Sequence, residues 1–223
     1  MALEVRYIKA TTHVTKNFSY FVFDRDAKDC VMIDPAGDPE QINSFLSNNH
    51  ITLSKVLLSH YHADHVYLAD YLAQEYDMQV FMLRTEIKYY GFDCKNLSAI
   101  SDRDQILCGR YTINAIHTPG HTKGSTCYLA GNHLFTGDTL FIEGCGICFG
   151  KGADPEDMFH SLQYLKTHID PQTCIYPGHS YGKQPGKTFA YLLQNNIYLQ
   201  IDDREQFIAF RMRKNQNKLF HFK

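Results

Sequence analysis

The chain has 223 residues, of which 44% are hydrophobic, so it can bury a substantial core and is expected to form one domain, with residues 182–223 as a shortened C-terminal helical extension. Its 22 basic residues against 24 acidic ones leave no positive excess that would favour nucleic acid or an anionic membrane as a partner. No apolar run predicts a membrane span or a signal peptide, and seven scattered cysteines fit reduced thiols, so we expect a cytoplasmic protein.

Strands and helices are expected to alternate along the chain. Short apolar runs bounded by turn residues predict strands at 3–8, 18–23, 30–33, 56–58, 80–83, 111–116, 126–129, 133–136 and 174–176. Asp38 and Asp154, each followed by proline, are the predicted N-caps of two helices. Apolar spacing predicts a third helix at 65–75 and one or two more within 187–214. This order predicts an α/β fold with two sheets flanked by helices.

A cluster of metal-ligand side chains follows the predicted strand at 56–58. His60, His62, Asp64 and His65 stand within six residues of one another in the chain. Imidazoles two positions apart at a strand end point to the same side, and the last two side chains, at the turn into a helix, can face a second ion. Three histidines and an aspartate so close together predict a metal site.

Three further ligand candidates, His121, Asp138 and His179, also follow predicted strands. Each comes directly after a glycine, whose missing side chain lets the backbone approach a crowded centre. One such glycine is typical of an ordinary turn. Three turns that each deliver a ligand-type residue favour one shared centre.

These residues resemble the metallo-β-lactamase superfamily, and within it the glyoxalase II branch. The resemblance runs from about residue 7 to residue 181 and includes the stretches 15–20, 33–35, 60–65, 117–122, 134–146 and 178–181. It implies an αββα sandwich with the metal ions at one edge. It also implies a full ligand set, in which one ion binds His60, His62 and His121, a second ion binds Asp64, His65 and His179, and Asp138 bridges the two.

Histidine and carboxylate ligands favour two zinc ions per chain, and they also suit iron or manganese. Between two such cations a bridging water ionises near neutral pH, and the hydroxide would attack a carbonyl that one ion polarises. Asp64 and Asp138 would offset the charge of the ions and orient the hydroxide, so they are the expected catalytic residues. The resemblance implies hydrolysis of an acyl thioester.

The expected substrate-binding residues are Tyr181, Ile147 and Phe149. Tyr181 matches a substrate-contacting tyrosine of the glyoxalase II branch. Enzymes of that branch follow a Gly-Cys-Gly motif with a basic residue and an aromatic pair that hold glutathione, whereas here Ile147 and Phe149 replace these groups. The sequence leaves open whether His117 orients a ligand, and whether Cys145 of the Gly-Cys-Gly motif does more than pack near the metals.

Overall length, the altered loop and the ending at 202–213 resemble a smaller subgroup, the zinc-dependent hydrolases of bacterial polyketide clusters such as the bacillaene cluster. The implied substrate is an acyl chain on phosphopantetheine, carried by an acidic acyl carrier protein. Six basic side chains near the C-terminus could meet such a carrier: Arg204, Arg211, Arg213, Lys214, Lys218 and Lys223. On one helix, Arg211 and Lys214 would share a face, although an ordinary solvated helix and tail has the same composition.

Other classes of protein remain as alternatives. A hydroxyacylglutathione hydrolase (glyoxalase II) would need another way to hold glutathione, and a mononuclear iron persulfide dioxygenase would carry an arginine where Ile147 stands. A lactamase fits less well, because common dizinc lactamases use cysteine where Asp138 stands. A metal-stabilised binding module is disfavoured, because a structural zinc needs only four ligands.

Overall fold

The computed structural model describes residues 3–11 and 16–213, which form two six-stranded sheets. The first sheet follows chain order: β1 (Glu4–Thr11), β2 (Lys16–Asp24), β3 (Asp29–Ile33), β4 (Thr52–Leu58), β5 (Gln79–Leu83) and β6 (Leu97–Ile100). The second sheet runs in reverse chain order: β12 (Lys187–Thr188), β11 (Cys174–Pro177), β10 (His133–Gly137), β9 (Thr126–Ala130), β8 (Tyr111–His117) and β7 (Gln105–Cys108). Strands β3 to β6 are parallel neighbours, as are β10 and β11, and the remaining pairs are antiparallel.

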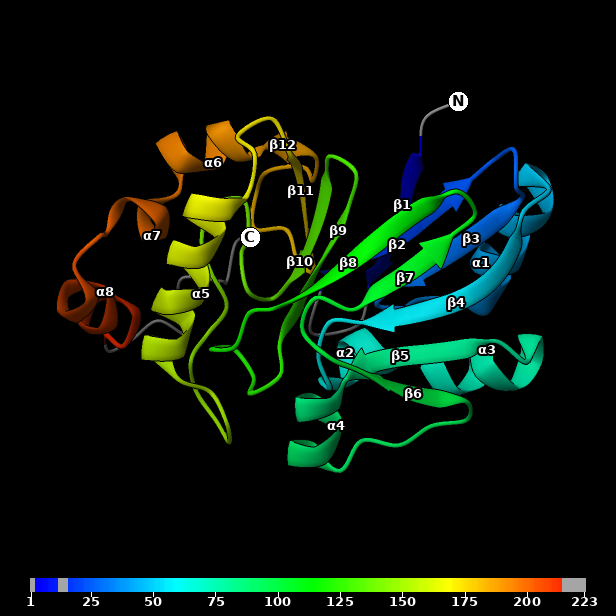
Figure 1. The fold of residues 1–223 in the computed structure, drawn as a ribbon, viewed down its shortest axis with the longest axis horizontal. Coiled ribbons are helices and arrows are strands. Elements are labelled where there is room, and N and C mark those ends of the chain that lie inside the picture. The colour runs from blue at the N-terminus through cyan, green and yellow to red at the C-terminus, as the bar shows by residue number, and fades with distance from the viewer. Residues whose placement is uncertain (1–2, 12–15, 214–223) are drawn as a thin grey trace.

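Helices cover the outer faces of both sheets. Along the first half of the chain they are α1 (Pro39–Asn49), α2 (Ala63–Val66), α3 (Ala69–Tyr76) and α4 (Arg84–Tyr90), and along the second half α5 (Pro155–His168), α6 (Phe189–Asn195), α7 (Ile197–Gln200) and α8 (Arg204–Arg211). Figure 1 shows α1 and α3 beside the first sheet and α5 to α8 beside the second. The predicted αββα arrangement is therefore confirmed. Both predicted caps are present, since the side chains of Asp38 and Asp154 accept hydrogen bonds from the first turns of α1 and α5.

Strand β2 shows how the sequence builds two cores at once. Successive side chains of a strand point to opposite faces, and here Phe21 and Phe23 pack under α1 and α3 while Tyr20 and Val22 face the second sheet. Each of these side chains is at most 2% exposed, and fully burying an apolar side chain of this size contributes about 1.5–3 kcal/mol. A third core lies between the second sheet and helices α5 to α8.

Some predicted elements differ from the structure. The helix expected at 65–75 is broken into α2 and α3, because the backbone N–H of Leu68 donates to the carbonyl of Pro35 at 3.1 Å instead of continuing the helix. The C-terminal region holds three short helices rather than one or two, since Asn196 ends α6 and its side chain caps α7. Four short elements, α4, β6, β7 and β12, have too few residues for a clear periodic pattern and were not predicted.

Among the described residues, no helix combines the length and the apolar character that crossing a bilayer requires.

Candidate metal centre

The structure brings all seven candidate ligands together at one edge of the sandwich. His60 and His62 lie in the turn between β4 and α2, and Asp64 and His65 lie on α2 itself. The other three ligands lie in the turns that follow β8, β10 and β11. Their ligand atoms form three overlapping sets, each within 4.8 Å: His60 with His62 and His121, His60 with His65 and Asp138, and Asp64 with His65 and His179. Because these sets share His60 and His65, they make one continuous centre. The imidazoles of His60, His62 and His121 are called the first group, and Asp64, His65, Asp138 and His179 the second group.

In the first group, three imidazole nitrogens converge. Nδ1 of His62 lies 3.0 Å from Nε2 of His60 and 3.0 Å from Nε2 of His121. Nδ1 of His121 must donate to the carbonyl oxygen of Ile147, at 2.8 Å, so Nε2 of the neutral ring presents a lone pair. Burial lowers the pKa of His62 to about 4 and also lowers the pKa of His60, which keeps both rings neutral. Lone pairs that face one another in this way suit a cation between them.

The second group contains the carboxylates. Nε2 of His65 lies 3.4 Å from Oδ1 of Asp138, and Nε2 of His179 lies 3.3 Å from Oδ2 of Asp138 and 3.5 Å from Oδ2 of Asp64. Oδ2 of Asp138 is also 3.6 Å from Nε2 of His121 in the first group. Oδ1 of Asp138 is buried and has no hydrogen-bond partner among the described residues. This carboxylate therefore lies between the two groups, within 3.6 Å of a histidine in each.

Electrostatics favour positive charge at the second group. Burial alone would raise the pKa of Asp138, but the charges of His179 and His65 outweigh it and hold the pKa well below its usual range. Burial would likewise lower the pKa of His65, yet the carboxylates of Asp138 and Asp34 raise it to about 9. The ionised carboxylates thus create a buried place for cations.

Asp34, to which the sequence analysis gave no role, orients one ligand from each group. Its Oδ2 accepts hydrogen bonds from Ser59 Oγ at 2.6 Å and from His65 Nδ1 at 2.9 Å, and its Oδ1 accepts from the Ser59 N–H at 2.7 Å. Because Ser59 donates its hydroxyl proton to this carboxylate, it must accept from His60 Nδ1, which lies 2.9 Å away. Both rings are thereby left with Nε2 facing the centre. The available signal was an aspartate directly after a buried strand.

Glu86 ties two ligand-bearing turns together. Its buried carboxylate accepts from the backbone N–H of Tyr61, at 2.9 Å, and from that of Gly124, at 2.7 Å. One contact fixes the turn that holds His60 and His62, and the other fixes the turn that holds His121. Glu86 lies on α4, which the sequence did not predict, so no signal pointed to it.

The glycines before the ligands serve different purposes. A Cβ on Gly178 would lie 2.5 Å from Oδ1 of Asp138, so the predicted close approach to the centre is confirmed there. At Gly120 the crowding comes from the backbone of Met158 on α5, and the φ of +135° favours glycine in any case. Gly120 therefore allows helix α5 to pack close, which differs from the expected reason.

Of the expected substrate-binding residues, Ile147 and Tyr181 contact residues of the centre, and Phe149 follows Ile147 on the same exposed loop. Ile147 and Phe149 are 42% and 57% exposed, and the Ile147 carbonyl contacts His121 directly. The ring of Tyr181 lies 6.1 Å from that of His179 and 5.0 Å from that of Phe141. Their roles in binding substrate stay predictions.

Cys145 and His117 both have structural roles near the centre. Cys145 is 1% exposed in the core beneath the centre, and burial raises the pKa of its thiol well above the usual range, so packing explains it. Nε2 of His117 donates to the carbonyl of Lys123 at 3.0 Å, which closes the turn that carries His121. His117 therefore acts on the turn and not on a ligand ring.

The prediction of an exposed basic face near the C-terminus is wrong for Arg211. Arg211 is fully buried and donates to the hydroxyl of Tyr198 at 2.9 Å, so it cannot belong to an exposed basic face. Arg204 pairs with Glu156 at 2.7 Å. The remaining expected members include Lys214, Lys218 and Lys223, which lie outside the described residues.

Comparisons with known proteins agree with this geometry. The family model of the metallo-beta-lactamase superfamily matches residues 14–179. BaeB of Bacillus velezensis, named a probable polyketide biosynthesis zinc-dependent hydrolase, is 47% identical over 99% of this chain and 98% of its own length. PksB of Bacillus subtilis, which bears the same description, is 42% identical over 100% and 99%. The crystal structure of ETHE1 from Myxococcus xanthus is 25% identical, with a TM-score of 0.82 over 94% of this chain and 91% of that one.

The two relatives span nearly the whole chain, so their names confirm the predicted class, a metal-dependent hydrolase. The matched region also contains every candidate ligand from His60 to His179. The chain therefore belongs to the metallo-beta-lactamase superfamily.

Proposed function

We propose that this chain hydrolyses acyl thioesters in polyketide biosynthesis, with two zinc ions held by the seven ligands of the centre. The observation that carries the proposal is the Asp138 carboxylate, which is buried, lies within 3.6 Å of histidines in both groups and has one oxygen without a hydrogen bond. Removing a charged oxygen from water without a hydrogen bond in exchange costs several kcal/mol, on the order of its desolvation free energy, and a bound cation offsets that cost. The names and full-length similarity of BaeB and PksB support zinc and the polyketide setting.

The donor set fits zinc, because neutral imidazoles and carboxylates are its usual ligands, although iron or manganese would also suit them. Two bound zinc ions would supply a Lewis acid that polarises the thioester carbonyl, and they would make water a nucleophile at neutral pH. The side chain of Asp64 is 26% exposed, against 10% for Asp138, so Asp64 is the acid better placed to exchange a proton with the attacking water. Asp138 sets the charge of the centre, and Asp34 keeps His60 and His65 oriented.

The surface beside His121 favours an acyl carrier protein or its phosphopantetheine arm over glutathione. Glutathione carries two carboxylates, and the exposed Ile147 and Phe149 offer them no charge or hydroxyl group. All seven cysteines are free thiols, which fits a reaction in the cytoplasm. Neither nucleic acid nor a membrane is a partner in this proposal.

The test is a panel of one acyl group on glutathione, coenzyme A and an acyl carrier protein, with zinc measured in the same sample. We expect two zinc ions per chain, faster hydrolysis of the phosphopantetheine thioesters, and loss of activity after chelation. The proposal would be overturned if protein with two bound zinc ions hydrolysed none of the thioesters, or if hydrolysis survived chelation of the zinc. Preference for the glutathione thioester would assign a hydroxyacylglutathione hydrolase, and oxygen uptake with a persulfide and a single iron would assign a dioxygenase.

A further inference from the structure

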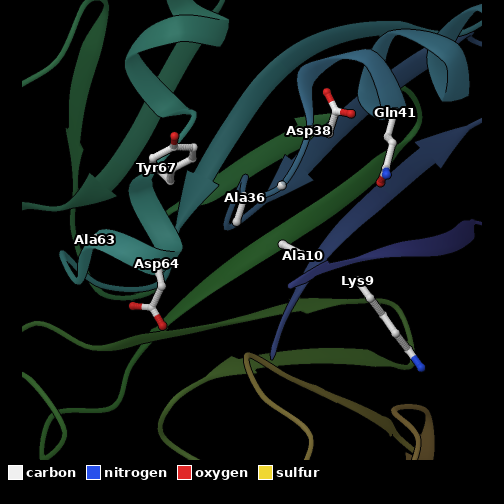
Figure 2. Close-up of a pocket in the computed structure, with 9 residues that line it drawn as sticks. Lys9, Ala10, Ala36, Asp38, Gln41, Ala63, Asp64 and Tyr67 are labelled. Carbon is white, nitrogen blue, oxygen red and sulfur yellow. The ribbon is translucent and has the colours of Figure 1, made fainter. Parts of the chain in front are cut away.

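A pocket of about 630 Å³ opens beside Asp64, within the range of about 300–1,000 Å³ that is typical of small-molecule sites. Figure 2 shows Ala36 and Ala10 between Asp64 on one side and Gln41 of α1 on the other. Asp64 is also a candidate ligand of the second metal group, so the pocket adjoins the centre at this side chain. A molecule bound at the centre can therefore extend into the pocket.

Small apolar groups make the floor of this pocket. Ala10 and Ala36 are each 2% exposed and present their methyl groups, and Gly37 between Ala36 and α1 adds no side chain. The rim is formed by exposed side chains, which include the charged Lys9 and Asp38 as well as Gln41 and Tyr67. The pocket thus has an apolar base. Among the described residues that line it, side chains able to form hydrogen bonds lie only along the rim.

The break between α2 and α3 places Tyr67 on this rim. Because Leu68 donates its N–H to Pro35, α2 ends at Val66 and Tyr67 stays 70% exposed. The turn that supplies Pro35 also supplies Ala36 to the floor and Asp34 to the hydrogen bonds behind the ligands. One turn therefore shapes the pocket and supports the metal centre.

We infer that this pocket binds the acyl chain of the thioester, so that the preferred substrates carry apolar chains longer than acetyl or lactoyl. The inference rests on the proposed function. An alkyl chain has no polar group to satisfy against the alanine floor, whereas a phosphopantetheine or glutathione arm has amides whose N–H and C=O groups would stay unpaired there. The thiol arm then leaves by the other side of the centre, past Ile147 and Phe149.

The experiment compares kcat/KM for acetyl, butanoyl and octanoyl thioesters of pantetheine. Each methylene that the pocket buries should raise kcat/KM about fourfold in the wild-type protein. Ala63→Leu fills the pocket next to Asp64, and Gln41→Trp narrows it from α1; both positions are exposed, so neither change strains the core. Both variants should lower the octanoyl-to-acetyl ratio by about tenfold or more. Ser47→Trp, an exposed position further along α1 that does not line the pocket, should keep the wild-type ratio.

A second readout does not depend on hydrolysis. In a ketone analogue, a methylene separates the sulfur from the carbonyl, so the ligand binds without being cleaved. Its dissociation constant should fall as the acyl chain lengthens, and Ala63→Leu should remove that trend while Ser47→Trp keeps it. Zinc content and melting temperature of each variant are measured in parallel, so that a loss of fold is recognised.

A flat chain-length profile in the wild-type protein, or one that neither pocket variant changes, would overturn the inference. So would variants that respond to the length of the thiol arm and not to that of the acyl chain. The proposed function fails separately: if no thioester of any length is hydrolysed but analogue binding still follows acyl length, the pocket assignment stands without it.

Discussion

Replacing Asp34 by asparagine should weaken metal binding without removing any candidate ligand. The carboxylate accepts three hydrogen bonds, two from Ser59 and one from His65. Asparagine has the same size and tolerates the left-handed backbone at this position, where φ is 51°. Its NH₂ group, however, is a donor where one accepting oxygen stood, so at least one of the three buried donors must face another donor.

Two independent magnitudes agree for this change. A buried donor left without its acceptor costs about 1–3 kcal/mol. Loss of an outer carboxylate that orients metal ligands lowers metal affinity by about 10–100-fold, which corresponds to roughly 1.4–2.7 kcal/mol. We therefore expect zinc affinity in Asp34→Asn to fall by about 10–100-fold, because His60 and His65 lose their fixed orientation.

The assay is competition for zinc against a chromophoric chelator. The matched control is Asp24→Asn, a second buried aspartate, which accepts from Arg110 and from the backbone N–H of Ala27 on the side of the fold where β7 and β8 join. The control should lower the melting temperature and leave zinc affinity unchanged. Wild-type zinc affinity in Asp34→Asn would refute the role of this carboxylate in orienting the ligands.

Four further changes test other parts of the structure. Asp138→Ala should abolish most turnover and reduce the zinc content toward one ion per chain, while the apolar cores keep the protein folded. A variant that still binds two zinc ions with unchanged kcat would contradict the bridging role. Ile147→Arg should raise kcat/KM for a glutathione thioester about tenfold, since charge-assisted hydrogen bonds contribute about 1.5–3 kcal/mol; no gain would count against the loop as the cause of selectivity. The hydrogen bonds from Arg110 hold the pKa of Asp24 well below its usual range. The contribution of this pair to the free energy of unfolding is therefore complete above about pH 4, and it is lost as the pH falls through the pKa of Asp24 in the folded protein. Wild-type melting temperature should accordingly drop more steeply than that of Asp24→Asn on acidification, and parallel curves would exclude this linkage. Arg211→Met should lower the melting temperature and leave the salt dependence of KM for a carrier-bound substrate as it was, because Arg211 lies inside the fold; a changed salt dependence would restore the docking hypothesis.

Five of the seven candidate ligands could be found from the sequence because they follow strands, and Asp64 and His65 because they come directly after His60 and His62 in the chain. His60 and His62 come after β4, Asp138 after β10 and His179 after β11, where the strand ends leave little freedom in position. Glycine before a ligand gave a second, local signal, and at Gly178 the signal had the expected cause. The spacing along the chain therefore contains most of the information about the centre.

Features decided by contacts distant in sequence could not be predicted. The break after α2 depends on the carbonyl of Pro35, which lies more than 30 residues earlier than Leu68. Arg211 was expected on a solvated face, because its charge is usually exposed, and its burial depends on Tyr198 and on the core beneath the Gly-Cys-Gly turn. In both cases local propensity gave way to tertiary packing.

Strand direction explains why the ligand-bearing turns meet. Strands β3 and β4 are parallel, so the turns after them, which hold Asp34 and Ser59, lie at one edge of the first sheet. Strands β10 and β11 are parallel in the second sheet, which places Asp138 beside His179 in the same way. Backbone hydrogen bonds then join the two edges, from Thr126 to Ser59 at 3.0 Å and from Phe18 to Gly178 at 2.9 Å. Ligands from both sheets thus surround one centre, and metal bound there would link the sheets at the edge where the backbone bonds already hold them together.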